Sequence, residues 1–176
     1  ELIAIIGKSG AGKSTLLHLI RNLAEETGNR MQDHREIETR SGLLTVGAGL
    51  TISYISQDTG FLSGTLSEYC RTEKLDYSLL LTLLRKLDFE RTQFEKPMES
   101  FSEGQKKKVL IAASFITPAH LYIWDEPLNY IDALSRVQIE DLILRCQPTL
   151  LFVEHDMAFV RRVTTRTVEL PGAGEN

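Results

Sequence analysis

The chain has 176 residues, of which 42% are hydrophobic, and it carries a formal net charge of −4. A chain of this size can bury roughly two thirds of its unfolded surface in a single globular core. The acidic balance argues against a segment that coats nucleic acid or an anionic membrane, since either needs a basic excess. We therefore expect no direct DNA binding.

Cysteine usage and hydropathy favour a soluble, cytoplasmic protein. The two cysteines, Cys70 and Cys146, lie far apart without metal-ligand spacing, which is typical of reduced thiols. No apolar run approaches the roughly 18 residues of a membrane span, and the first residues form no signal peptide. The sequence starts at Glu1, already inside a strand pattern, and this predicts a segment of a longer polypeptide.

The N-terminal third predicts a strand, a glycine loop and a helix in direct succession. Residues 2–6 form an apolar run suited to a strand of a parallel sheet that is covered on both faces. From Lys13 the apolar spacing is helical, and it fades near Gly28. The polar residues 29–40 are expected to form a surface connection. Two short strands follow, at 43–46 and 50–55.

The remainder alternates leucine-rich helical patterns with short apolar runs. Dense leucines at 75–87 predict a buried helix, and residues 109–115 continue a second helix that Pro118 closes. Apolar runs at 121–124 and 150–153 predict strands, with a crossover helix at 131–144 between them. Ligands bind beyond the carboxyl ends of parallel strands, so Gly7, Asp125 and His155 are expected at one edge of the sheet.

Residues 7–15 carry the most specific motif. Two glycines followed by Lys13 and Ser14 fit the P-loop pattern, between a predicted strand and helix as the motif requires. Backbone amides would surround a phosphate, Lys13 would reach the β and γ phosphates, and the Ser14 hydroxyl would ligate Mg²⁺. The strand-to-helix context disfavours the alternative, a glycine turn followed by Lys-Ser by chance. The predicted nucleotide-binding residues are Gly7, Lys8, Ser9, Gly10, Ala11, Gly12, Lys13, Ser14, Thr15 and Gln57.

An acidic pair and a histidine at strand ends complete the predicted catalytic set. Asp125 can hold Mg²⁺ through a water, and Glu126 is placed to polarise the water that attacks the γ-phosphate. Alone, such a pair is more often a helix cap or loop surface, but downstream of a P-loop the catalytic interpretation is favoured. His155 could donate to the γ-phosphate, and Gln57 could coordinate Mg²⁺ and sense that phosphate. The predicted catalytic residues are Glu126, His155 and Lys13.

A second anion site is predicted just before the helix that contains residues 109–115. Ser102 and Gly104 would present a hydroxyl and free amides at the positive end of that helix, followed by Glu103 and Gln105 in the same segment. Without context, an N-cap followed by a solvated face of lysines at 106–108 is the simpler explanation.

Taken in order, these segments resemble the nucleotide-binding domain of ATP-binding-cassette proteins over nearly the whole chain. The resemblance makes 7–15 the Walker A motif, Gln57 the Q-loop, 102–105 the signature, 121–126 Walker B, Asp132 the D-loop and His155 the switch histidine. It implies an α/β P-loop NTPase fold, a mainly parallel sheet flanked by helices, with the N-terminal strands missing. It also implies one partial domain, 1–176, with a core lobe at 1–58 and 119–176 and an inserted helical signature subdomain at 59–118.

The family implies ATP as the nucleotide, Mg²⁺ as its metal ion, and a face-to-face second cassette whose site the signature completes. That cassette can lie on the same polypeptide or come from a homodimer. Glu103 stands where a glycine is common, and this places a negative charge near a phosphate. The strands that would precede Glu1 are missing, together with the aromatic residue that usually stacks on adenine.

The segment that begins at Glu126 is similar to the corresponding segment of the ABC-F subfamily. Its sequence is Glu126-Pro127-Leu128-Asn129-Tyr130-Ile131-Asp132. With the Glu154-His155-Asp156 segment, it looks like the C-terminal cassette of the antibiotic-resistance branch. That branch implies action on the ribosome through parts outside this chain. The alternative is the ATPase subunit of a membrane transporter, docked near residues 57–67. A third possibility is that this segment alone binds nucleotide feebly and turns over nothing.

Overall fold

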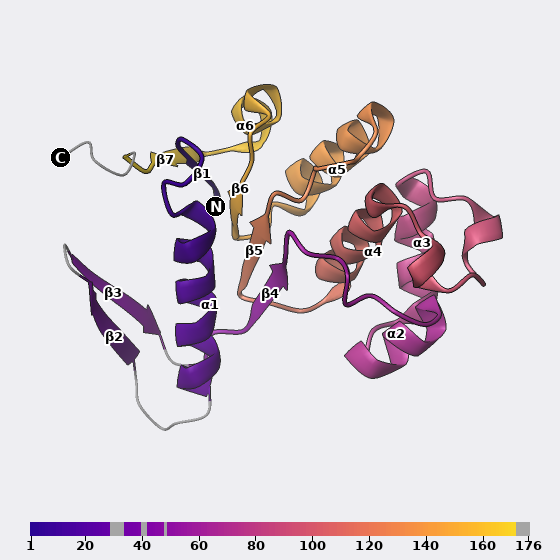
Figure 1. Ribbon diagram of the computed structural model, residues 1–176, viewed down its shortest axis with the longest axis horizontal. Helices are drawn as coiled ribbons and strands as arrows, with labels where there is room; N and C mark the ends of the chain where they lie inside the picture. The colour runs from indigo at the N-terminus through magenta and orange to yellow at the C-terminus, as the bar shows by residue number, and fades with distance from the viewer. Residues whose placement is uncertain (29–33, 40–41, 48, 172–176) are drawn as a thin grey trace.

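The computed structural model describes residues 1–28, 34–39, 42–47 and 49–171 (Figure 1). A five-stranded sheet in the order β4-β5-β6-β1-β7 forms its centre, and every neighbouring pair is parallel. The α/β fold with a parallel sheet that the sequence predicts is confirmed. The strands of this sheet are β1 (Leu2–Ile6), β4 (Ile52–Ile55), β5 (Leu121–Asp125), β6 (Leu150–Val153) and β7 (Arg166–Glu169).

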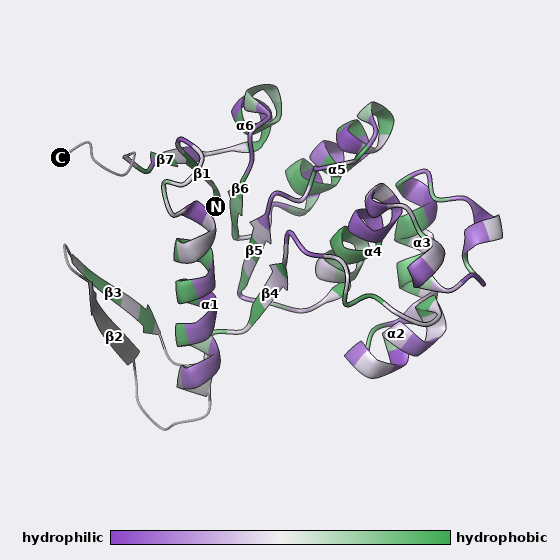
Figure 2. Cartoon of the chain, viewed as in Figure 1, coloured by the Kyte–Doolittle hydropathy of each residue, from purple (hydrophilic) through white to green (hydrophobic). Residues whose placement is uncertain are grey.

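Helices cover both faces of this sheet. Successive side chains of a strand point to opposite faces of the sheet. Trp124 of β5 and Phe152 of β6 therefore pack in a core with α4, α5 and α6, and the adjacent residues Ile123 and Val153 pack against α1 on the other face. Figure 2 shows α1 banded with hydrophobic and hydrophilic residues, as expected of a helix with one buried face. The helices are α1 (Lys13–Gly28), α2 (Leu66–Glu73), α3 (Tyr77–Lys86), α4 (Glu103–Ile116), α5 (Ala133–Cys146) and α6 (Met157–Val163). None of the described helices is both long and apolar enough to cross a membrane.

A separate antiparallel hairpin, β2 (His34–Thr39) and β3 (Gly42–Gly47), lies beside α1 (Figure 1). Val46 of β3 packs on Leu23 and Ala24 of α1. The expectation that 29–40 is only a surface connection is wrong for 34–39, which form a strand; 29–33 and 40 lie outside the described residues. Residues 34–39 are polar apart from one isoleucine, so they show no apolar periodicity. Their strand conformation is stabilised by pairing with β3.

Helices α3, α4 and α5 begin at capping side chains, and these mark the helix boundaries more accurately than the spacing of apolar residues. The predicted helix at 75–87 is α3, which begins after the N-cap Asp76, and α5 begins after the N-cap Asp132 rather than at 131. Ser102 caps α4 in a reciprocal capping box with Gln105. α2, α6 and β7 were not predicted, since short elements carry too few apolar repeats to be recognised.

The strands that carry the predicted site end level with one another. Ile5 of β1 and Asp125 of β5 both stand in register with Val153 of β6. The residues that follow these three strands therefore emerge at the same edge of the sheet, as predicted for Gly7, Asp125 and His155.

Candidate active site

The loop between β1 and α1 is curled around its own lysine. The Lys13 ammonium donates to the carbonyl oxygens of Gly7 and Lys8, both at 2.9 Å, and the side chain is buried. Gly7 has φ +144°, and a Cβ there would lie 2.7 Å from the carbonyl oxygen of Leu170. Only glycine fits this position, and it allows the chain to turn from strand to helix here.

A cavity of about 370 Å³ opens over this loop and gathers residues from four strand ends. P-loop residues line it together with Gln57 after β4, Glu126 after β5 and His155 after β6. Residues as far apart in the sequence as Ser9 and His155 thus meet where the parallel strands end. The lining residues are Ser9, Gly10, Gly12, Lys13, Ser14, Thr15, Gln57, Glu126 and His155.

The side chains of Ser14, Gln57 and Asp125 meet next to this cavity. Ser14 Oγ donates to Asp125 Oδ1 at 3.1 Å, and Gln57 Nε2 reaches the same oxygen at 3.5 Å. Asp125 is 2% exposed; burial raises the pKa of its carboxyl group, while the hydrogen bond from Ser14 acts in the opposite direction. A hydroxyl, a carboxylate and an amide oxygen are hard donors that suit Mg²⁺, so these residues fit that ion.

Glu126 and His155 are in direct contact in the lining of the cavity. Glu126 Oε1 and His155 Nε2 lie 3.1 Å apart, and Asn129 Nδ2 donates to Glu126 Oε2 at 2.7 Å. The backbone of Glu126 is in the left-handed region, with φ +49°, and its N–H donates to the carbonyl of Val153. The contact from Asn129 was not predicted as part of the site, although the residue belongs to the quoted motif.

The signature residues stand apart from this cavity. Within the described residues, none of Ser102, Glu103, Gly104 and Gln105 lines it. The Glu103 carboxylate accepts from Thr59 Oγ1 at 2.5 Å and from Lys106 Nζ at 3.0 Å; the Thr59 and Lys106 contacts lower the pKa of Glu103. The carboxylate expected beside a phosphate is therefore bonded within its own chain, next to the segment that follows Gln57.

The lysines after the signature are not a solvated face, contrary to the simpler sequence interpretation. Lys107 is 1% exposed and donates to the carbonyl of Ser56 at 2.8 Å, and burial lowers its pKa. Lys108 pairs with Asp132 at 2.8 Å. Burial opposes the ionisation of Asp132, but hydrogen bonds from Lys108 and Ser135 outweigh it and hold the pKa of Asp132 below its usual range. The start of α4 is thus tied to Ser56, next to Gln57, and to Asp132, the N-cap of α5.

Gly104 makes a close approach that supplies a test of this packing. A Cβ on Gly104 would lie 2.4 Å from the carbonyl oxygen of Tyr130, a backbone atom in the turn after Glu126. We expect Gly104→Ala to displace that turn and to lower kcat for any reaction that depends on Glu126 about 10-fold or more, because small displacements of positioned groups are costly. Gly47→Ala is the matched control, since nothing lies within 4 Å of its Cβ. Equal kcat values for the two variants would contradict this account.

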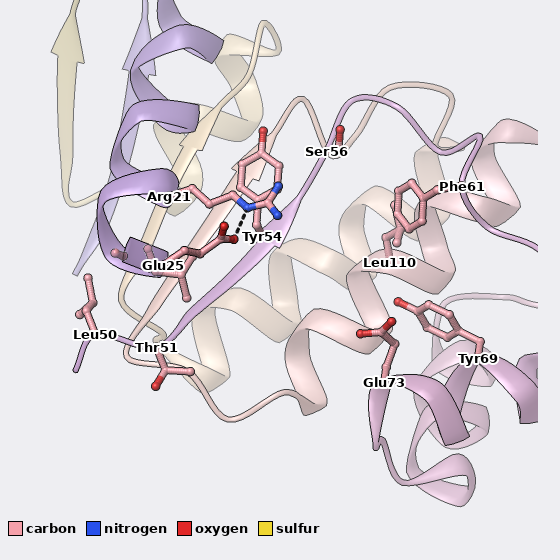
Figure 3. Close-up of a pocket in the computed structure, with 12 residues that line it drawn as sticks. Arg21, Glu25, Leu50, Thr51, Tyr54, Ser56, Phe61, Tyr69, Glu73 and Leu110 are labelled. Atoms are coloured by element: carbon pink, nitrogen blue, oxygen red, sulfur yellow. Dashed lines mark hydrogen bonds and ion pairs between the residues drawn. The ribbon is translucent and has the colours of Figure 1, made fainter. Parts of the chain in front are cut away.

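Another cavity, of about 700 Å³, lies between α1, β4, α2 and α4 (Figure 3). The Arg21 guanidinium stacks 4.9 Å over the ring of Tyr54 and pairs with Glu25 at 2.7 Å. Phe61, which is 58% exposed, also lines it. None of its lining residues belongs to the P-loop cavity, and its size alone does not make it the reaction site.

Comparison with known proteins places this geometry in a family. Residues 1–129 match the sequence model of the family described as "ABC transporter". The chain is 30% identical to the "Ribosome protection protein VmlR" of Bacillus subtilis, covering 99% of this chain and 30% of that protein. It is 28% identical to the "ATP-binding protein Uup" of Caulobacter vibrioides, covering 99% of this chain and 28% of the relative.

A solved structure gives the same assignment. The chain superimposes on a protein described as "Structure of ATP binding subunit of ABC transporter" with a TM-score of 0.77 and 26% identity, covering 97% of this chain and 74% of that one. This chain spans less than a third of the length of the two curated relatives. With the P-loop cavity and the family match over residues 1–129, the chain belongs to the ABC transporter family, as an ATP-binding cassette.

Proposed function

We propose that this cassette binds ATP together with Mg²⁺ and hydrolyses it to ADP and phosphate. The observation that carries the proposal is the single cavity that unites Lys13, Ser14, Gln57, Glu126 and His155 from four strand ends. A lysine, a hydroxyl and carboxylates at that spacing are the groups that phosphoryl transfer to water needs.

Each side chain has a role that follows from its place. The P-loop amides and Lys13 bind the β and γ phosphates, with Lys13 exchanging the carbonyls of Gly7 and Lys8 for phosphate oxygens. Ser14, Gln57 and Asp125 would hold Mg²⁺, which would offset phosphate charge when bound. Glu126 accepts the proton of the attacking water, and His155, 3.1 Å from it, orients that carboxylate and donates to the γ-phosphate.

A second cassette completes the site in this proposal. The signature, residues 102–105, does not line the P-loop cavity of its own chain in the described structure, and it begins a helix whose N-terminal amides suit an anion. We assign residues 1–58 and 119–176 to the core lobe and residues 59–118, with α2, α3 and α4, to the helical part that presents the signature. The partner cassette comes from the same polypeptide or from a second copy.

The proposed physiological target is the ribosome, in a cytoplasmic protein of the ABC-F type that confers antibiotic resistance. Support comes from the segment Glu126-Pro127-Leu128-Asn129-Tyr130-Ile131-Asp132 and from a relative whose name is ribosome protection protein. The ribosomal contacts would be made by parts of the polypeptide beyond this cassette.

Pelleting of ribosomes with the full-length protein tests this target. We expect the protein to co-sediment with ribosomes in the presence of a non-hydrolysable ATP analogue. A Lys13→Ala variant should not co-sediment, because it binds the nucleotide weakly. Absence of co-sedimentation in the unaltered protein would contradict ribosome action. It would leave the ATPase proposal to be judged by phosphate release.

A second candidate function, the ATPase component of a membrane transporter, is favoured by one observation. The cavity of about 700 Å³ with the exposed ring of Phe61 is a surface that a partner protein could enter, near the residues 57–67 expected to dock one (Figure 3). Flotation of the full-length protein with membranes, without ribosome pelleting, would favour this candidate.

A third candidate concerns the segment alone. Because half of each composite site comes from a partner, residues 1–176 by themselves would bind nucleotide feebly and release no phosphate above a Lys13→Ala control. Activity of the isolated segment above that control would exclude it.

A further inference from the structure

A buried carboxylate lies directly behind the Glu126 and His155 pair. Glu154 follows β6 and is 5% exposed, and it is not among the residues that line the P-loop cavity in the described chain. Its Oε1 accepts from the backbone N–H of Leu128 at 2.8 Å, and its Oε2 accepts from the backbone N–H of His155 at 3.0 Å. One side chain therefore holds the backbones of both loops that carry the facing catalytic groups.

Arg136 of α5 holds the same two loops from the other side. Its Nη2 donates to the carbonyl of Leu128 at 3.2 Å, its Nε to the carbonyl of Ile131 at 3.0 Å, and its Nη1 pairs with Asp156 at 3.0 Å. Leu128 is thus held at its N–H by Glu154 and at its carbonyl by Arg136. Hydrogen bonds to charged groups are the strong ones, so the two loops are joined rigidly.

The turn that these contacts hold is conformationally unfavourable by itself. It begins at Glu126 with φ +49° and includes Tyr130 with φ +66°, both in the left-handed region that residues with a Cβ rarely adopt. Such a conformation persists only when its surroundings determine it, and it often occurs where function requires a side chain in one place. Here the side chain in question is that of Glu126.

Burial raises the pKa of Glu154, and backbone N–H groups of Leu128, His155 and Asp156 act against that shift. Burying a carboxylate is costly unless hydrogen bonds compensate. A hydrophobic side chain would fill the same space without that cost. The carboxylate is therefore explained by the backbone amides of Leu128 and His155 that it holds.

We propose that Glu154 is a positioning residue for ATP hydrolysis, which fixes the turn after Glu126 against the loop of His155 so that these two side chains meet. The proposal rests on the proposed ATPase function. Glu154 touches neither nucleotide nor water in this scheme; it acts only through the 3.1 Å contact of Glu126 Oε1 with His155 Nε2.

Glu154→Gln in the full-length protein tests this role. Glutamine fills the same volume but turns one acceptor into an amide donor, which opposes the N–H of His155 or of Leu128. We expect kcat for ATP hydrolysis to fall about 10- to 100-fold, because displacement of a catalytic group by about 1 Å has that effect. The Kd for ATP is expected to stay within about twofold, since the P-loop is not touched.

Glu140→Gln is the matched control. Glu140 is also a buried carboxylate, 8% exposed, but it pairs with Arg162 of α6 and holds neither catalytic loop. We expect its kcat to equal that of the unaltered protein within about twofold. If Glu154→Gln and Glu140→Gln lower kcat equally, the loss of any buried negative charge explains the fall in kcat, and the positioning role of Glu154 is overturned.

A double-mutant cycle with His155→Ala separates positioning from a general loss of stability. If Glu154 acts by bringing Glu126 and His155 together, Glu154→Gln should lower kcat several-fold less in a His155→Ala background. Equal effects in both backgrounds, or a fall in ATP affinity as large as the fall in kcat, would overturn the inference. Absence of any Lys13-dependent turnover in the unaltered protein would instead contradict the proposed function itself.

Discussion

Glu126→Gln in the full-length protein is expected to lower kcat for ATP hydrolysis by about 10²- to 10⁴-fold, the range typical for loss of a general base. The amide cannot accept a proton, but it preserves the volume and can still accept the hydrogen bond from Asn129. ATP affinity should therefore change little. Phosphate release under saturating ATP, together with a nucleotide-binding assay, measures both quantities.

The structure also defines the control for this substitution. Glu103→Gln changes a carboxylate that is bonded to Thr59 and Lys106 and does not line the P-loop cavity of its own chain. Its effect on the chemical step is expected to be smaller by at least 10-fold. Turnover of Glu126→Gln at the unaltered rate would remove Glu126 from the role of base.

Lys13→Ala is the second substitution with a large expected effect. Removing a charged donor to phosphate should weaken ATP binding about 10- to 150-fold, corresponding to about 1.5–3 kcal/mol. Hydrolysis should fall by a further 10²-fold or more, because the ammonium also stabilises charge that develops during phosphoryl transfer. Titration calorimetry and phosphate release are the measurements.

The protein offers a lysine that separates this effect from a general loss of positive charge. Lys86, at the exposed end of α3, lies in none of the described cavities. Lys86→Ala is expected to bind and hydrolyse ATP as the unaltered protein does. If Lys13→Ala behaves in the same way, the P-loop does not bind the nucleotide.

Much of the fold was predictable because its signals are local. An apolar run that ends in glycine predicted β1, and acidic or histidine residues after apolar runs predicted the ends of β5 and β6. The P-loop needs only eight consecutive residues and a strand-to-helix context to be recognised. These local signals also predicted that Gly7, Asp125 and His155 would emerge at one edge, because parallel strands share their direction.

The parts that were not predicted depend on tertiary contacts. The strand β2 is polar and is stabilised by pairing with β3, so no periodicity reveals it. Residue type alone predicts that Lys107 and Lys108 are exposed, but the carbonyl of Ser56 and the carboxylate of Asp132 bind them and both side chains are buried. The role of Glu154 depends on the amide of Leu128, 26 residues away, and no local pattern records that contact.

The position of bound nucleotide tests the central claim most directly. A crystal structure of the full-length Glu126→Gln protein with ATP and Mg²⁺ should place the triphosphate in the P-loop cavity, with Lys13 Nζ turned from the carbonyls of Gly7 and Lys8 to phosphate oxygens. A triphosphate bound in the cavity beside Tyr54 and Phe61, with Lys13 still bonded to those carbonyls, would contradict the account.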